Sequence, residues 1–210
     1  MSSEYLDLAD YRRRVAALYL RVRAGDLPAV ERLHAFRAEK DELFRTHPQS
    51  PIPRDRRPSF GGLSYWPHDP ELRLSAALEP EAVDAPSGMP LSGGGALGLR
   101  RIGAVSFRLV DETHRLGVYW FTDYAGGIFI PFRDATTGIE TYGGGRYLWD
   151  SAKGADLGST GDELVLDFNY AYHPSCVFDA RWSCPLAPLA NRISAPIRAG
   201  ERLVGVTRND

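Results

Sequence analysis

The stretch AVSFRLVDETHRLGVYWFTDYAGGIFIPFR, residues 104–133, decides the fold class of this 210-residue chain. Apolar side chains occupy every second position in three runs within it, at Val105–Leu109, Leu116–Phe121 and Ile128–Arg133. A period of two is typical of β-strands. The separators are short and rich in Asp, Thr and Gly, as hairpin turns are, and they lie at Asp111–Arg115, Asp123–Gly127 and Asp134–Gly138. The stretch therefore predicts an antiparallel meander.

The aromatic residues of the second run predict a curved sheet. Tyr119, Trp120 and Phe121 are consecutive, so both faces of that strand carry aromatic side chains. A strand that is covered on both sides favours a closed or half-closed barrel, or a sheet under helices, over an open sheet with one solvated face.

A helical hairpin is predicted before the meander. Apolar residues recur there in steps of three and four, which place them on one stripe of a helix: Leu8, Tyr11, Val15, Leu18 and Val22. Asp26 is expected to cap a second helix, which ends near Thr46 because Pro48 disfavours helical backbone at His47. We therefore predict an α+β, mainly β fold: an N-terminal helical hairpin packed on an antiparallel meander that forms a barrel-like or strongly curved sheet.

The length of the chain supports one sizeable core, so we predict a single domain over residues 1–210. Residues 1–46 form the helical hairpin, and residues 96–210 form the antiparallel β core with a C-terminal loop rich in Cys and Pro. Residues 47–95 form a connector rich in proline and glycine. It contains a short strand near Leu72–Leu78 and a loop at Pro80–Gly95.

The charge balance excludes several classes of partner. A formal charge of −2 with 25% charged residues provides no broad basic field, so neither nucleic acid nor an anionic membrane surface is expected as a partner. No apolar run approaches the ~20 residues that span a bilayer. The N-terminus lacks the uninterrupted apolar core of a signal peptide, so a cytoplasmic location is expected. The sequence does not indicate which cofactor is used, if any, and it does not decide whether the protein forms a homodimer.

The segment Phe132–Tyr147 concentrates polar side chains and three glycines on one predicted hairpin. Gly143–Gly145 allow the backbone to approach another group closely or to bulge the strand. No Lys-Ser or Lys-Thr follows, so this is not a phosphate-binding loop. The flanking arginines are expected either to hold an anionic ligand or to pair internally with Asp134, Glu140 or Asp167. The candidate ligand-binding residues are Arg133, Tyr142, Gly144, Arg146 and Asn169.

The segment Asp167–Asn191 begins as a strand and is expected to leave the sheet at Pro174. Strand ends that lead into loops commonly display polar site residues. The candidate catalytic residues are Asp167, Tyr172, His173 and Cys176, and the first three could act as general acid or base.

Three interpretations of Cys176 and Cys184 stay open. As metal ligands, they lack the Cys-x2-Cys knuckle and need a further donor such as His173. As a catalytic group, a Cys176 thiolate could be activated by His173. The structural alternative, which we favour, is a pair of buried thiols or a local disulfide.

Several motifs together resemble one family: Phe60-Gly-Gly-Leu-Ser-Tyr-Trp66, Pro131-Phe-Arg-Asp134, Thr141-Tyr-Gly-Gly-Gly-Arg-Tyr147, Leu166-Asp-Phe-Asn169, His173-Pro-Ser-Cys176 and Cys184-Pro-Leu186 with Asn191. Over nearly its whole length the chain resembles the bacterial family known as domain of unknown function 1684. The resemblance implies no activity, because none is assigned to that family. Asn-Pro usually stands in the family where His173-Pro174 stands here, which speaks against a catalytic base shared by all members or marks this chain as specialised.

The sequence favours a small-molecule binding protein or enzyme, with a polar and aromatic pocket for an anionic ligand, and does not decide whether it is an enzyme. One alternative is a non-catalytic protein interaction module that uses the C-terminal aromatic and proline-rich loop. Another is a polar core network in which Asp167 and Arg146 close the barrel. We expect the Arg133–Tyr147 hairpin and the Asp167 strand to be neighbours in one sheet, with Arg146 and Asp167 in contact.

Overall fold

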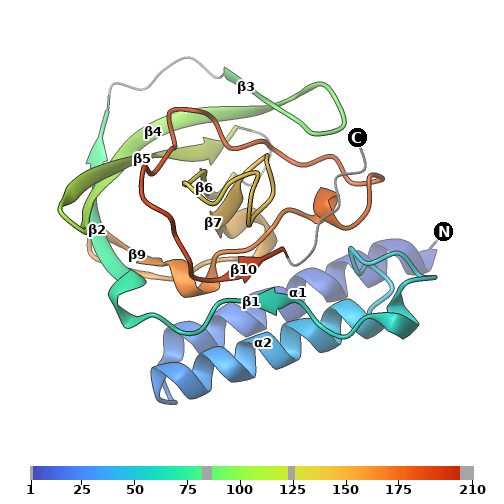
Figure 1. Ribbon diagram of the computed structural model, residues 1–210. Helices are drawn as coiled ribbons and strands as arrows, with labels where there is room; N and C mark the ends of the chain where they lie inside the picture. The colour runs from blue at the N-terminus through green and yellow to red at the C-terminus, as the bar shows by residue number, and fades with distance from the viewer. Residues whose placement is uncertain (1, 82–86, 123–125, 204–210) are drawn as a thin grey trace.

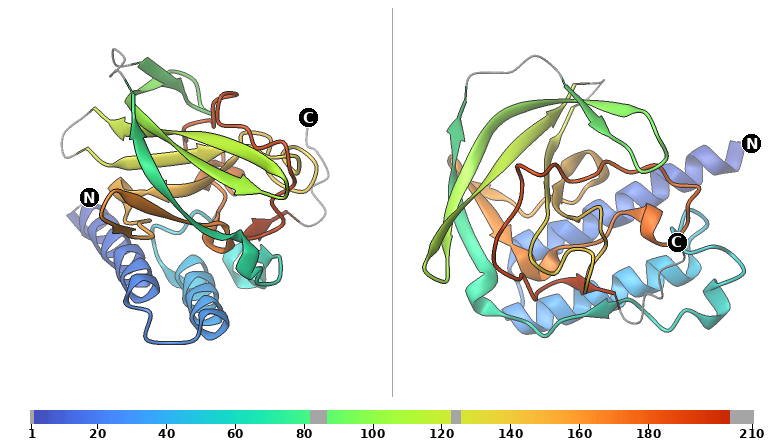
Figure 2. Two further views of the ribbon diagram at one scale, coloured as in Figure 1. Left: turned by 90° about the vertical axis from the view of Figure 1, so that its left-hand side faces the viewer. Right: turned by 45° about the horizontal axis from the view of Figure 1, so that its top comes forward.

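The computed structural model describes residues 2–81, 87–122 and 126–203. Within these residues, two N-terminal helices pack against an antiparallel sheet that curls into a half-barrel (Figure 1). The views in Figure 2 show the helical pair side by side along one flank of the barrel. This confirms the predicted α+β, mainly β fold with an N-terminal helical hairpin.

The helical hairpin has the predicted extent but not the predicted cap. It consists of α1 (Ser2–Ala24) and α2 (Ala29–Thr46). Asp26 does not cap α2: the helix begins two residues later than expected, with Pro28 as the N-cap and no side-chain cap. Its C-terminal end at Thr46 agrees with the restriction that Pro48 imposes, because His47 is already extended with ψ 138°.

The eight strands of the main sheet, within the described residues, are β2 (Arg73–Pro80), β3 (Ser87–Pro90), β4 (Ala96–Leu109), β5 (Glu112–Phe121), β6 (Ile128–Phe132), β7 (Arg146–Asp150), β8 (Ser159–Thr160) and β9 (Glu163–Asp167). Their hydrogen-bonded order is β7-β6-β5-β4-β2-β9-β8, and β3 pairs with β4 outside this path. A separate ladder joins β1 (Ser64–Tyr65) to β10 (Glu201–Arg202). The sheet is antiparallel throughout, as a meander requires.

Two loop predictions are wrong in part. The separator at Asp111–Arg115 is almost entirely strand, because Leu109 pairs with Glu112 and leaves a turn of only Val110 and Asp111. The loop predicted at Pro80–Gly95 contains β3, which pairs with the start of β4. Residues 82–86 of that loop, and residues 123–125 of the Asp123–Gly127 separator, lie outside the described residues.

The core lies between the concave face of the sheet and the helices. Its fully buried members from the strands and from the residue that follows β9 include Val105, Leu116, Val118, Ile130, Phe132, Leu148, Leu166 and Phe168. From the hairpin, Leu18, Tyr19, Leu33 and Phe36 join the same cluster. Each fully buried side chain of this size contributes about 1.5–3 kcal/mol of transfer free energy, so the cluster links the hairpin to the sheet.

The expected pairing between the Arg133–Tyr147 hairpin and the Asp167 strand is wrong. β7 ends the hydrogen-bonded path, and β9 lies beyond β6, β5, β4 and β2 along it. The sheet nevertheless curls so that β9 comes back toward β7. The indole N–H of Trp149 in β7 donates to the carbonyl oxygen of Val165 in β9 at 2.8 Å. The other edge of β7 meets the later segment at Tyr147, whose backbone exchanges hydrogen bonds with Tyr172.

The C-terminal segment returns across the open end of the half-barrel (Figure 1). Short 3-10 helices interrupt the irregular parts of the chain: η1 (Arg57–Ser59), η2 (Pro70–Leu72), η3 (Ser151–Lys153), η4 (Phe168–Tyr170) and η5 (Ser175–Val177). The Asp167 strand therefore leaves the sheet at η4, earlier than the predicted exit at Pro174. Of the described helices, none is long and apolar enough to cross a membrane.

Candidate functional site

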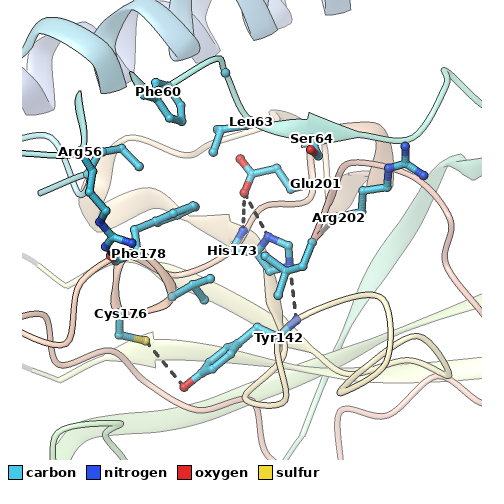
Figure 3. A pocket seen from close by; sticks show the side chains of 14 residues that line it. Arg56, Phe60, Leu63, Ser64, Tyr142, His173, Cys176, Phe178, Glu201 and Arg202 are labelled. Atoms are coloured by element: carbon cyan, nitrogen blue, oxygen red, sulfur yellow. Dashed lines mark hydrogen bonds and ion pairs between the residues drawn. The ribbon is translucent and has the colours of Figure 1, made fainter. Parts of the chain in front are cut away.

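A pocket of about 450 Å³ lies where the connector, the Tyr142 loop, η5 and β10 meet (Figure 3). The connector contributes one wall through Ile52, Arg56, Phe60 and Leu63. The opposite side comes from His173, Cys176 and Phe178 on the segment that follows β9, with Glu201 and Arg202 from β10. Four regions that are far apart in sequence thus converge on one cavity, which we call the η5 pocket.

A chain of buried charged and polar groups forms the inner wall of the η5 pocket. The Glu201 carboxylate is 2% exposed and lies 2.7 Å from Lys40 Nζ of α2. Its second oxygen accepts the His173 backbone N–H at 2.8 Å and faces His173 Nδ1 at 3.4 Å. Burial alone raises the pKa of Glu201, but Lys40 and His173 reverse that effect and bring it to about 2. Glu201 is therefore ionised at neutral pH, and Lys40 balances its charge.

His173 is held in one orientation by contacts to both ring nitrogens. Nδ1 faces Glu201, while Nε2 accepts the backbone N–H of Tyr142 at 3.4 Å. Burial lowers the pKa of His173, and Glu201 opposes that shift. A neutral ring with the proton on Nδ1 satisfies both contacts. The lone pair on Nε2 is therefore already engaged, which leaves His173 poorly placed as a general base.

The two thiols of the chain are both free and have unequal surroundings. Cys176 is half-buried in the η5 pocket, with its Sγ 3.9 Å from Tyr142 Oη. The hydrogen bond from the Cys184 thiol is the largest influence on Cys176, and together with Ser92 and Tyr142 it lowers the pKa of Cys176 to about 6. The same contact with Cys176, followed by burial, raises the pKa of Cys184. Burial likewise raises the pKa of Tyr142, to about 12.

Two arginines stand at the rim of the η5 pocket. Arg56 is exposed and donates to the carbonyl oxygen of Phe178, two residues beyond Cys176. Arg202 is exposed and follows Glu201 on β10. Within residues 2–81, 87–122 and 126–203, neither guanidinium forms an ion pair with a carboxylate. In Figure 3 they lie on opposite sides of the Glu201–His173 pair.

The structure brings three of the predicted site residues together and disperses the others. Tyr142, His173 and Cys176 line the η5 pocket. Tyr172 instead faces a second cavity of about 250 Å³ between the helical hairpin and the barrel, where the Lys40 ammonium lies 4.6 Å from its ring centroid. His173 lines both cavities, so the Lys40–Glu201–His173 chain forms a wall between them.

Arg146 has a structural role instead of the expected ligand-binding role. Its guanidinium is 1% exposed and pairs with Asp134 at 3.0 Å. It also donates to the carbonyl oxygens of Ile197, Ala199 and Glu201. The expected contact with Asp167 is therefore wrong, because Asp134 takes that place.

Asp167 and Asn169 also serve the backbone. Asp167 accepts the N–H of Asn169 and lies 3.6 Å from Arg73, while Asn169 exchanges two hydrogen bonds with the backbone of Asp69. Burial raises the pKa of Asp167. Neither residue lines the η5 pocket or the second cavity.

Arg133 and Gly144 are used in packing the C-terminal segment. Arg133 donates to the carbonyl oxygen of Ala187 at 2.7 Å. The carbonyl of Gly144 accepts the N–H of Ala187, and a Cβ on Gly144 would clash with the Tyr142 ring and lie 2.9 Å from Leu186 Cδ2 of the C-terminal segment. Gly144 therefore permits a close approach of the two segments, as one of the sequence interpretations expected.

Sequence reasoning did not select Lys40, Glu201, Arg56 or Arg202 as site residues. Lys40 carried a signal, because it occupies the apolar stripe of α2 together with Leu33, Phe36, Leu43 and Phe44. A lysine on a buried face needs a partner. Nothing in the sequence indicated that this partner is Glu201. Among the described residues, no group of three or more His, Cys, Asp or Glu side chains is placed to hold a metal ion, and Cys176, Cys184 and His173 do not form one.

The geometry defines a curled half-barrel protein with a helical hairpin and a pocket at the barrel end. The family model described as protein of unknown function (DUF1684) matches residues 58–202, and the chain belongs to this family. A solution NMR structure of an uncharacterized protein from Haloarcula marismortui is similar, with 36% sequence identity and a TM-score of 0.59. The similarity covers 82% of this chain and 93% of that one. No match was found among curated proteins.

Proposed function

We propose that the η5 pocket binds a small anionic molecule, as ligand of a binding protein or substrate of an enzyme. The observation that carries this proposal is the pair of rim arginines, Arg56 and Arg202, which form no ion pair within the described part of the chain. Among the described residues that line the pocket, the one carboxylate is Glu201, and Lys40 already neutralises it. The rim therefore has a local excess of positive charge.

The dimensions and chemistry of the pocket agree with such a ligand. A volume of about 450 Å³ lies within the range of roughly 300–1,000 Å³ that is usual for small-molecule sites. Guanidinium groups match carboxylate and phosphate oxygens in bidentate geometry. Phe60, Leu63 and Phe178 provide apolar walls, and Tyr142 and Cys176 supply the polar floor.

The test is a calorimetric titration of the whole protein with a panel of small dicarboxylates and phosphate monoesters. Arg56→Gln and Arg202→Gln should each weaken the best binder by roughly 10- to 100-fold, because each substitution removes a charge-assisted hydrogen bond. Arg100→Gln is the matched control, since Arg100 is exposed on β4 and lies outside the pocket. Equal affinity of all four proteins, or no binding by any anion of the panel, would refute the proposal.

The alternative of an interaction module has weaker support. The aromatic residues of the C-terminal loop turn inward: Phe178 packs edge-on against Phe44, and Trp182 lines the second cavity. Leu189 is exposed at 75%, but it is a single side chain. An interface core normally presents a contiguous group of aromatic and apolar residues.

A further inference from the structure

Cys176 and Cys184 form a contact pair in which one thiol is accessible and the other is buried. The Cys176 sulfur opens to the η5 pocket and lies 3.9 Å from Tyr142 Oη, with the Cys184 thiol and Ser92 as neighbours that affect its ionisation. Cys184 is 3% exposed and lines the second cavity. An accessible sulfur beside a polar hydroxyl is suited to attack, and a buried sulfur near it is suited to resolve the product.

The segment that carries Cys184 is firmly anchored. Its backbone N–H donates to Ser92 Oγ at 3.0 Å, and its carbonyl accepts the Ser92 N–H at 2.9 Å. The next residues continue this attachment, because Leu186 donates to the carbonyl of Pro90. Cys176 lies on η5, a single short turn. The second sulfur is thus fixed, while the first lies on an element small enough to adjust.

We propose that Cys176 and Cys184 are a dithiol pair that exchanges with small anionic disulfides bound in the η5 pocket. The choice of substrate class rests on the function proposed above. Arg56 is attached to the carbonyl of Phe178, close to η5, so a carboxylate held by Arg56 would bring the rest of its molecule toward Cys176 (Figure 3).

The exchange consists of two balanced substitutions. The Cys176 thiolate attacks one sulfur of R–S–S–R, the S–S bond breaks, and the leaving thiolate takes a proton from water to become R–SH. Cys184 then loses its proton to the second departing thiolate and attacks Cys176 Sγ, which releases a second R–SH. Two electrons pass from the dithiol to the substrate, and the protein retains a Cys176–Cys184 disulfide. Run in reverse, the same steps oxidise two small thiols.

The inequality of the two thiols suits this order of attack. The pKa of Cys176, about 6, leaves most of that thiol ionised at neutral pH, whereas the raised pKa of Cys184 keeps it protonated. When Cys176 enters a mixed disulfide, its negative charge disappears and Cys184 becomes easier to deprotonate. Cys184 is therefore activated only after the first step.

The experiment compares two disulfides of similar size on the reduced full-length protein, 3,3′-dithiodipropionate with two carboxylates and uncharged 2-hydroxyethyl disulfide. After free thiols are alkylated, peptide mapping should find a Cys176–Cys184 disulfide, formed roughly tenfold or more faster with the dicarboxylate. Cys184→Ser should accumulate the mixed disulfide on Cys176, and Cys176→Ser should form neither product. Mapping of the unmutated protein decides the result even if a cysteine variant fails to fold.

The outcomes separate the two proposals. If neither reagent produces a Cys176–Cys184 disulfide, the dithiol proposal is overturned while the anion site stands on its own titration. If the disulfide forms equally fast with both reagents, the anionic substrate class is overturned. In the Arg56→Gln, Arg202→Gln double variant, we expect the preference for the dicarboxylate to disappear while the protein disulfide still forms.

Discussion

Arg146 shows how a buried charge takes its role from its surroundings. A guanidinium that is 1% exposed has lost its hydration, so its donors must be satisfied inside the protein. Asp134 and three carbonyl oxygens of the C-terminal segment do this for the two terminal nitrogens, whereas Nε has no partner within the described residues. The sequence indicated that Arg146 could pair with Asp134, Glu140 or Asp167. It could not choose among them, because the choice depends on how strands distant in sequence are arranged.

Replacement of Arg146 is predicted to impair folding rather than ligand recognition. Arg146→Ala leaves Asp134 buried without its cation and should cost about 3–5 kcal/mol of unfolding free energy, measured by urea denaturation. Arg198→Ala is the control, since its ion pair with Glu140 is exposed and is worth only about 0–1 kcal/mol. A loss below about 1 kcal/mol for Arg146→Ala would contradict the structural role.

Tyr142 is predicted to lower the pKa of Cys176. Tyr142→Phe removes a hydroxyl 3.9 Å from the sulfur that helps to stabilise the thiolate, so the pKa of Cys176 should rise above about 6. The rate of alkylation as a function of pH measures this pKa directly. Tyr5→Phe, at an exposed tyrosine of α1, should leave the profile unchanged, and an unaltered profile in Tyr142→Phe would show that the hydroxyl has no influence.

At the scale of elements, local periodicity predicted what each segment is, but not always where it ends. The meander was recognisable because Val105, Phe107 and Leu109 alternate with polar residues over a buried face. β3 was missed because Ser-Gly-Met-Pro carries no alternation, and its pairing with β4 alone makes it a strand. Asp26 was mistaken for a cap because Pro28, with φ −51° and ψ 145°, takes the N-cap position and the helix begins at Ala29.

The β4–β5 turn offers a stabilising substitution. Val110 has φ 54°, a left-handed conformation that a β-branched residue adopts at a cost of about 1–2 kcal/mol. Val110→Gly should therefore raise the unfolding free energy by about 0.5–1 kcal/mol, after the greater chain entropy of glycine is included. Val110→Ala retains a Cβ and should gain much less. Thermal and urea unfolding of the two variants check the prediction, which is wrong if alanine stabilises as much as glycine.

At the scale of the whole molecule, Glu201 joins α2, the segment after β9 and β10 at one buried point. The pKa of Glu201 falls from 4.5 to about 2 on folding, so its contribution to stability is present above pH 4.5 and is lost as pH falls toward 2. Burial lowers the pKa of His173, so the unfolded chain gains a proton there first, below about 6.5. Both groups therefore weaken the fold in acid.

We predict that stability declines gently below about pH 6.5 and more steeply below about 4.5, measured as the urea midpoint. Glu201→Gln should be less stable at neutral pH, because it leaves Lys40 buried without its counter-charge, and should lose the steep acid phase. Glu163→Gln, at an exposed carboxylate of β9, should follow the unmodified protein. If the steep acid phase persists in Glu201→Gln, other carboxyl groups are responsible for it.

If the chain is a single domain, as predicted, it should unfold in one transition. Urea denaturation followed by two probes tests this. Helix and sheet share one buried cluster, in which Phe36 of the hairpin packs edge-on against both Tyr19 of α1 and Tyr170 after β9. Coincident curves from circular dichroism and tryptophan fluorescence are expected, since two-state unfolding gives the same midpoint for different probes. Separate midpoints would mean that the hairpin unfolds independently of the barrel.

The segment Ile197–Glu201 also sets an order of events during synthesis. Lys40 leaves the ribosome before Glu201, which balances its charge. Arg146 leaves it before Ile197 and Ala199, whose carbonyl oxygens accept hydrogen bonds from its guanidinium. Until then, neither side chain can be buried without a large desolvation penalty. The nascent protein must therefore keep the barrel end open and its apolar interior accessible, and a messenger truncated before codon 197 would yield a chain that cannot close.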